Sequence, residues 1–440
     1  MPVARLLGPL LLALVALSAC QDKDAPLPGE RIPIRPDETA PVATPGRGAA
    51  VAIPPAVMNA DWTHRNGSAP GRLVHPALRP QPQLVWSVAL GEGDAKRRRL
   101  VVGPIVAGGV VYAMDAGGEL SAVTRNGQIA WRRSLVPAGQ APDSGPGGGM
   151  AAANGVLYAT TGFGEVFALD PRTGGTIWKR TLDASIQAPP LVYDGRVVAV
   201  QRDDVAVAMD ARTGETLWTV QGAGGTGLMG GASPAASGPL VVVPFSSGEL
   251  IGVLGRNGMT VWGTAITGGR RALARNRIND VTGDPVIVGS TVYASNQSGR
   301  TIRLDTETGE RMWTIGEGSY GPASPVGNAV FLVSDEGALV RVNAETGEIL
   351  WSRQLPEFFP ARGFLWRKGT PWRSVPYYGP ILAGGRLWVA SADGWLRAFS
   401  PVDGSLLASI QLPGGAAAAP AVAGGVMYVA TRDGQLLAFQ

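Results

Sequence analysis

ALDPRTGGTIW at residues 168–178 and AMDARTGETLW at residues 208–218 are two copies of one pattern, written A-x-D-x-x-T-G-x-x-x-W. A looser copy has Gly404 and then Ala408 where the tryptophan should stand. Other copies, two of them one residue shorter in the turn, end at Trp131, Trp262, Trp313 and Trp351. A pattern that recurs in this way predicts an array of structural repeats.

The sequence around each copy predicts short strands. An apolar run after Pro, a Gly turn, a second run ending in Tyr, Val or Ala, another Gly turn and a third apolar run precede each tryptophan strand. Successive copies end 38 to 57 residues apart, which is typical of four-stranded propeller blades with occasional loop insertions. One blade cannot cover its own faces, so the repeated tryptophan is expected to pack between neighbours.

The two ends of the repeat region complete each other. Residues 421–439 begin an eighth repeat that stops before its tryptophan strand. Residues 84–90, LVWSVAL, resemble an isolated final strand, and Trp86 precedes Trp131 by 45 residues, one normal repeat. Pairing the two would remove the free edges of the ring. The sequence therefore predicts an all-β, eight-bladed β-propeller of four-stranded antiparallel blades, closed by pairing the N-terminal strand with the C-terminal blade.

Composition supports this prediction. Hydrophobic residues make up 45% of the 440 residues and charged residues 16%, with 62 Gly and 35 Pro, a mixture that suits many short strands and tight turns. Basic residues gather in two stretches, 96–99 and 270–277, without a nucleic-acid-reading motif around them. We interpret both stretches as solvated loops and expect no nucleic-acid partner.

The N-terminus has the layout of an export signal. Residues 1–19 carry one early arginine, an apolar core and small residues before Cys20. The stretch LSAC at residues 17–20 resembles a bacterial lipobox, and a structural disulfide cannot explain Cys20 because it is the only cysteine. We expect residues 1–19 to be a signal peptide, residues 20–57 a lipidated cysteine with a Pro-rich disordered spacer, and residues 58–440 the propeller. Gln21 after the cysteine favours the outer membrane, with the propeller on the periplasmic face.

The repeat resembles the pyrroloquinoline-quinone-type propeller repeat, shared by quinoprotein dehydrogenases and by the BamB lipoproteins of the outer-membrane β-barrel assembly (BAM) machinery. The resemblance covers roughly residues 60–440. The dehydrogenases typically carry adjacent cysteines near the quinone, whereas this chain has no cysteine after Cys20. Lipobox, spacer and eightfold closure resemble the BamB lipoproteins throughout. That resemblance implies a non-enzymatic scaffold that assists folding and insertion of outer-membrane proteins.

The same resemblance implies partner-binding loops. RINDVT at residues 277–282 is similar to the family stretch RLSDVD, matching at Arg277, Asp280 and Val281. Leu228 and Met229 lie where the family can show Ser-Leu-Arg-Gly, so Leu228 matches and Met229 departs. The resemblance implies that Leu228, Met229, Arg277, Asn279 and Asp280 contact the POTRA domains of a BamA-like insertase, alongside other BAM lipoproteins. Unfolded outer-membrane proteins are a further candidate partner, and Asp280 has the alternative role of a turn acceptor.

A second candidate surface lies in the longest interval between repeats, residues 357–378. It contains seven aromatic residues interleaved with basic ones, among them Trp366 and Arg367. Aromatic and arginine side chains dominate protein-binding hot spots. The alternative is that this insertion folds back as local core.

No residue set predicts catalysis. The chain has two histidines, His64 and His75, no Cys/His cluster with metal-ligand spacing, and no nucleophile or phosphate-loop motif. Asp170, Asp210 and Asp305 recur at equivalent repeat positions, which indicates a repeated turn hydrogen bond. We therefore expect no catalytic, cofactor-binding or metal-binding residues. The alternatives that stay open are a quinone-dependent periplasmic oxidoreductase and an envelope propeller that binds some other protein.

Overall fold

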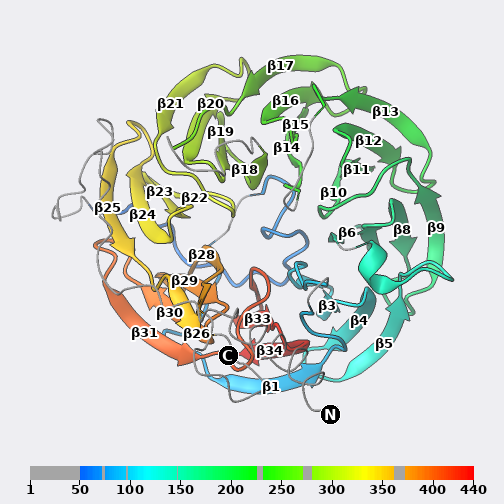
Figure 1. Ribbon diagram of the computed structural model, residues 1–440, viewed down its shortest axis with the longest axis horizontal. Coiled ribbons are helices and arrows are strands. Elements are labelled where there is room, and N and C mark those ends of the chain that lie inside the picture. Colours follow the sequence, from blue (N-terminus) through cyan, green and yellow to red (C-terminus); the bar gives the residue numbers. More distant parts are fainter. Residues whose placement is uncertain are drawn as a thin grey trace, which may run out of the picture. The chain divides into compact units, whose positions relative to one another are not determined.

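The computed structural model describes residues 50–71, 75–95, 98–145, 147–224, 231–270, 280–360 and 372–440. Over these ranges the strands form eight four-stranded antiparallel sheets and one two-stranded sheet. The eight larger sheets follow one another around a ring, and the sheet that joins the two ends of the repeat region has β1 at its outer edge (Figure 1). This confirms the predicted eight-bladed β-propeller.

Blades 1 to 4 follow the repeats in chain order. Blade 1 comprises β2 (Ile105–Ala107), β3 (Val110–Met114), β4 (Glu119–Thr124) and β5 (Ile129–Ser134). Blade 2 comprises β6 (Gly148–Ala153), β7 (Val156–Thr161), β8 (Glu165–Leu169) and β9 (Thr176–Thr181). Blade 3 comprises β10 (Leu191–Tyr193), β11 (Arg196–Val200), β12 (Val205–Asp210) and β13 (Thr216–Gln221). Blade 4 comprises β14 (Ala235–Ser237), β15 (Leu240–Pro244), β16 (Glu249–Leu254) and β17 (Thr260–Ala265).

Blades 5 to 7 continue this order, and blade 8 joins the two ends of the repeat region. Blade 5 comprises β18 (Val281–Val288), β19 (Thr291–Asn296), β20 (Arg300–Asp305) and β21 (Arg311–Ile315). Blade 6 comprises β22 (Ser324–Val326), β23 (Ala329–Val333), β24 (Ala338–Asn343) and β25 (Ile349–Gln354). Blade 7 comprises β28 (Tyr377–Ala383), β29 (Arg386–Ser391), β30 (Trp395–Phe399) and β31 (Leu406–Gln411). Blade 8 comprises β32 (Ala421–Ala423), β33 (Val426–Ala430), β34 (Gln435–Phe439) and β1 (Leu84–Ala89).

The repeated tryptophans link each blade to the next. Each donates its indole N–H to a main-chain carbonyl in the following blade's turn between third and fourth strands, over 2.8 to 3.0 Å. The turn glycine lies against the ring. At Gly214, where φ is +71°, an added Cβ would lie 2.7 Å from an atom of the Trp178 ring. The glycine of the repeat thus adopts a left-handed conformation and leaves room for the flat indole. A residue with a Cβ would be strained in this conformation and would collide with the ring.

Blade 8 confirms the predicted closure. β1 pairs antiparallel with β34, with Leu84 opposite Phe439 and Val88 opposite Leu436. Most of the chain separates these two strands, so no turn joins them. The tryptophan position of blade 7, Ala408, faces this blade without a turn. An indole there would have no carbonyl and glycine to dock on, which is a physical reason for the alanine.

An inner strap, residues 50–71 and 75–78, crosses the inner strands and contacts all eight blades (blue in Figure 1). Its Trp62 is fully buried and exchanges two 2.8 Å main-chain bonds with Val106 of blade 1. Contacts to the other blades join Ala52 to Asn328, Asn59 to Gly424, Thr63 to Ala152, His64 to Val192, Ala69 to Ala236, Pro70 to Ile287, and Pro76 to Gly384. The predicted spacer, as far as it is described, therefore also contacts blade 6.

The insertion after blade 6 is described in part, at residues 356–360 and 372–375. Its described strands, β26 (Phe358–Pro360) and β27 (Trp372–Ser374), form an antiparallel hairpin. Among the described residues, the one helical segment is the 3₁₀ turn η1 (Pro142–Ser144). In that same portion, no helix combines the length and apolarity needed to cross a membrane.

Candidate docking surface

The blade topology places the predicted partner-binding linkers of blades 3 to 5 at one rim. In a four-stranded antiparallel blade the fourth strand ends at the same edge where the first strand begins. The linkers between blades therefore leave and return at this rim, which also carries the turns between second and third strands. Leu228 and Met229 belong to the linker from blade 3 to blade 4, and Arg277, Asn279 and Asp280 to the linker from blade 4 to blade 5.

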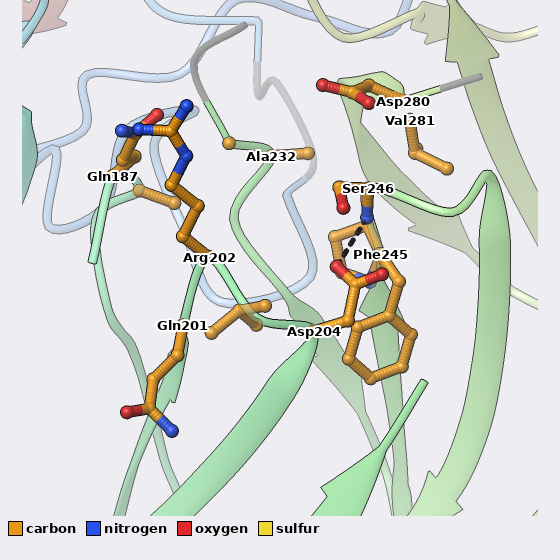
Figure 2. A pocket seen from close by; sticks show the side chains of 13 residues that line it. Gln187, Gln201, Arg202, Asp204, Ala232, Phe245, Ser246, Asp280 and Val281 are labelled. Carbon is orange, nitrogen blue, oxygen red and sulfur yellow. Dashed lines mark hydrogen bonds between the residues drawn. The ribbon is translucent and has the colours of Figure 1, made fainter. Parts of the chain in front are cut away.

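These two linkers meet at one depression (Figure 2). Gly231 and Ala232, from the first linker, and Asp280 and Val281, where the second enters β18, all line it. The second-to-third-strand turns of blades 3 and 4 supply further walls, with Gln201, Arg202, Asp204, Phe245 and Ser246. Sequence spacing does not reveal this meeting, because the two linkers are separated by the whole of blade 4.

The depression has a rigid polar wall. Asp204, 1% exposed and with a φ of +62°, accepts hydrogen bonds from the backbone N–H groups of Ser246 at 2.8 Å and Ser247 at 3.1 Å. These bonds tie the turn of blade 3 to that of blade 4. The Phe245 ring adds an apolar wall, and Arg202 is exposed on the opposite side (Figure 2). Mixed apolar and charged walls of this kind suit a protein segment as ligand.

Of the predicted site residues, the described ranges contain Asp280. It is 5% exposed at the entry to β18 and lines the depression. Its role in partner binding stays a prediction. The other predicted residues lie outside the described ranges: Cys20, Leu228, Met229, Arg277, Asn279, Trp366 and Arg367.

Arg270 anchors the start of the second linker. Its side chain is 14% exposed and pairs with Glu317 at 2.8 Å and with Asp335 at 3.2 Å, while its backbone N–H donates to Ser298. Burial lowers the pKa of Arg270, but the hydrogen bond to Asp335 and the charge of Glu317 outweigh it and raise the pKa above its ordinary value. Burial likewise raises the pKa of Glu317. Near its start, the second linker is thus fixed to blades 5 and 6 through Arg270. Where it enters β18, the backbone N–H of Val281 donates to the carbonyl of Phe245 in blade 4.

The interpretation of the basic stretches as solvated loops is wrong for Arg270, whose largely buried side chain lies in an ion-pair network. Arg98 and Arg99 lie in a loop with their side chains partly exposed, and they pair with Glu92 and Asp94. The acidic partners of Arg270 come from other repeats, so neighbouring sequence gives no signal for them.

The repeated aspartates cap turns, as predicted. Asp170 and Asp305 each accept a bond from the backbone N–H two residues later. Asp210 accepts bonds from Thr213 and Arg212, and the bond from Thr213 contributes most to lowering the pKa of Asp210. These carboxylates therefore accept hydrogen bonds from the backbone of their own repeats.

Comparison with known proteins gives the family. A family model described as outer membrane protein assembly factor BamB matches residues 124–353 and 361–440. The BamB of Burkholderia pseudomallei (strain K96243) is 31% identical over 237 residues, 52% of this chain and 58% of that protein. The BamB of Bordetella pertussis is 25% identical over 354 residues, 80% of this chain and 84% of that protein. The chain thus spans well under two thirds of the Burkholderia relative.

Solved structures support the fold. BamB from Moraxella catarrhalis matches with a TM-score of 0.63 at 21% identity, over 82% of this chain and 97% of that one. A quinohemoprotein alcohol dehydrogenase from Comamonas testosteroni matches with a TM-score of 0.64 at 14% identity, over 87% and 81%. At such identities a shared propeller does not by itself distinguish a scaffold from an enzyme. The family model, which matches more than half of the sequence, does assign it: this chain belongs to the outer membrane protein assembly factor BamB family.

Proposed function

We propose that this chain is a non-enzymatic scaffold lipoprotein of the outer-membrane β-barrel assembly complex. It is held on the periplasmic face of the outer membrane by lipid on Cys20, docks to the POTRA domains of a BamA-like insertase and assists insertion of outer-membrane proteins. Family membership supports the role. The single structural observation that carries the docking site is the meeting of the two predicted linkers at one depression.

The walls of the depression support protein binding. A partner segment seated there would lie between the turns of blades 3 and 4, beside the exposed Arg202. Asp204 and Arg270 hold the surrounding turns in place before binding, and a preformed surface loses little conformational entropy on association. Leu228 and Arg277 supply the apolar anchor and the charged contact in this proposal, with Met229 and Asn279 beside them.

A charge reversal tests the proposal. The full-length lipoprotein is purified from detergent-solubilised envelopes, and the proteins bound to wild type, Arg277→Glu and Arg256→Glu are identified by mass spectrometry. Arg256 is a matched control, because it is exposed in a turn at the opposite rim of blade 4. We expect wild type and Arg256→Glu to recover a POTRA-containing insertase and Arg277→Glu to lose most of it.

The other outcomes separate the proposed function from the proposed docking site. Equal recovery by all three proteins would retain the function but move the docking site. Absence of an insertase from all three preparations would refute the function.

The second candidate function is quinone-dependent oxidation, which the likeness in fold to the quinohemoprotein dehydrogenase favours. Such quinones are held with a calcium ion, which requires several oxygen ligands. Across the described residues, no three His, Cys, Asp or Glu side chains lie close enough together to hold a metal ion. The described residues therefore offer no acidic cluster for the calcium ion that would accompany the quinone. Dye reduction with alcohols after addition of pyrroloquinoline quinone and Ca²⁺ would overturn the non-enzymatic assignment.

A further inference from the structure

The tip of the inner strap reaches the two linkers of the docking surface. Residues 63–67 form a tight turn, in which Thr63 donates to the carbonyl of Gly67 and the N–H of Gly67 donates to His64. This turn presents Arg65 and Asn66 to Asp284 of β18. Asp284 lies four residues after Asp280, so the strap contacts the strand into which the second linker leads.

Asp284 is a buried junction. Its carboxylate is 3% exposed and accepts hydrogen bonds from Asn66 at 2.6 Å, from the backbone N–H of Ser233 at 2.8 Å and from Arg65 at 3.4 Å. Arg65 also donates to the carbonyl of Gly231 at 3.2 Å. Gly231 and Ser233 belong to the first linker. One carboxylate of blade 5 thus joins the strap and the first linker to the strand that the second linker enters.

Neighbouring main-chain bonds keep this junction in register. Ala236 of β14 donates to the carbonyl of Ala69, and Ile287 of β18 donates to the carbonyl of Pro70. The strap is packed closely here, because a Cβ added to Gly71 would lie 2.4 Å from the carbonyl oxygen of Pro285. The strap therefore runs between the inner strands of blades 4 and 5 and bonds to both.

We propose that Asp284, with Arg65 and Asn66, is a positioning site for the docking surface. It fixes Gly231 and Ser233 of the first linker relative to β18, and with them the neighbouring lining of the depression that a partner segment meets. This inference rests on the proposed function for its partner, but the positioning itself is a property of this chain. A buried carboxylate is costly to desolvate, and its use here, where apolar packing would fill the space, indicates a role in fixing geometry.

The test compares two asparagines of the strap. Asn66→Ala removes the bond to Asp284. Asn59→Ala is the matched control, because Asn59 donates to the carbonyl of Val422 in blade 8 at 2.8 Å, away from the docking linkers. Amide hydrogen exchange is followed in residues 231–236 and 280–288 of the full-length protein, and binding to the periplasmic POTRA fragment of the insertase is measured by biolayer interferometry.

We expect Asn66→Ala to speed exchange of the Ser233 amide at least tenfold and to weaken binding at least fivefold. Asn59→Ala should lower the melting temperature about as much as Asn66→Ala does, but it should change neither the exchange of the Ser233 amide nor the binding. Combining Asn66→Asp with Asp284→Asn reverses donor and acceptor, and we expect this pair to restore both readouts relative to Asn66→Asp alone. A bond that only stabilises the fold would let the pair restore exchange and melting temperature but would leave binding unchanged in every variant.

Equal effects of Asn66→Ala and Asn59→Ala, or failure of the paired exchange to rescue, would overturn the positioning role. If exchange responds as expected but wild type does not bind the POTRA fragment, the positioning role stands and the proposed function fails. If wild type binds and Asn66→Ala binds equally well despite faster exchange, the junction does not serve docking and the inference fails.

Discussion

Replacing the turn glycine of blade 3 tests whether the repeat depends on contact between glycine and tryptophan. Gly214→Ala places a methyl group at a φ of +71°, 2.7 Å from an atom of the Trp178 ring. Gly195→Ala is a matched control in the same blade, because Gly195 has a φ of +70° and nothing within 4 Å of the added Cβ. The two substitutions therefore share the backbone strain and differ in the clash.

The magnitude follows from these two contributions. The left-handed conformation costs an alanine roughly 1 to 2 kcal/mol at either position. Overpacking against a fixed ring adds about 1 to 3 kcal/mol at residue 214. Displacement of the Trp178 indole also weakens its 2.9 Å bond to the carbonyl of Ala211. We expect Gly195→Ala to lower the free energy of unfolding by about 1 kcal/mol and Gly214→Ala by about 3 kcal/mol.

Urea unfolding followed by circular dichroism measures the difference, with midpoints compared at equal slope. A double variant locates its origin: in a Trp178→Ala background, Gly214→Ala should cost no more than Gly195→Ala, because the ring is gone. Equal destabilisation by the two single glycine variants would refute the view that the turn glycine is required by the neighbouring indole.

Three further predictions concern residues that the fold brings together. Arg270→Met leaves the buried Asp335 and the partly buried Glu317 without their cation, and we expect a loss of about 3 kcal/mol in urea unfolding. Ala408→Trp should not raise the melting temperature, since no turn receives the indole, whereas Trp351→Ala should cost about 3 to 5 kcal/mol. Burial lowers the pKa of His64 to about 4, from 6.5 in an unfolded chain, and the bond to Val192 offsets only part of this. The unfolded chain is thus protonated first, and stability should fall by up to about 3 kcal/mol between pH 6.5 and pH 4; His64→Gln should flatten this fall.

The architecture was predictable from local pattern. The spacing of the tryptophans, the orphan strand around Trp86 and the incomplete last repeat predict eight blades and their closure, since each blade is built from residues close in sequence. The missing tryptophan at residue 408 could be seen in the sequence. Its physical reason could not, because that depends on which blade receives the indole.

The candidate site was only partly predictable. The two linkers were found through a family resemblance, whereas Arg270, Asp204 and Asp284 were missed. Each of these three acts through partners on other repeats, and no local pattern marks such pairs.

The inner strap shows most clearly what the sequence pattern could not predict. Its sequence, rich in Pro and poor in regular strand pattern, predicts a disordered spacer over residues 20–57 and assigns residues from 58 onward to the propeller, with no strand before residue 84. Periodicity reports which face of a strand is buried, and the described part of this segment forms no strand but contacts successive blades through isolated hydrogen bonds. By itself the sequence determined the repeats, the closure and the turn chemistry, all of which depend on neighbours along the chain. The route of the strap, the pairing of Asp284 with Asn66 and the meeting of the two linkers were decided only when the ring brought distant residues within hydrogen-bonding distance.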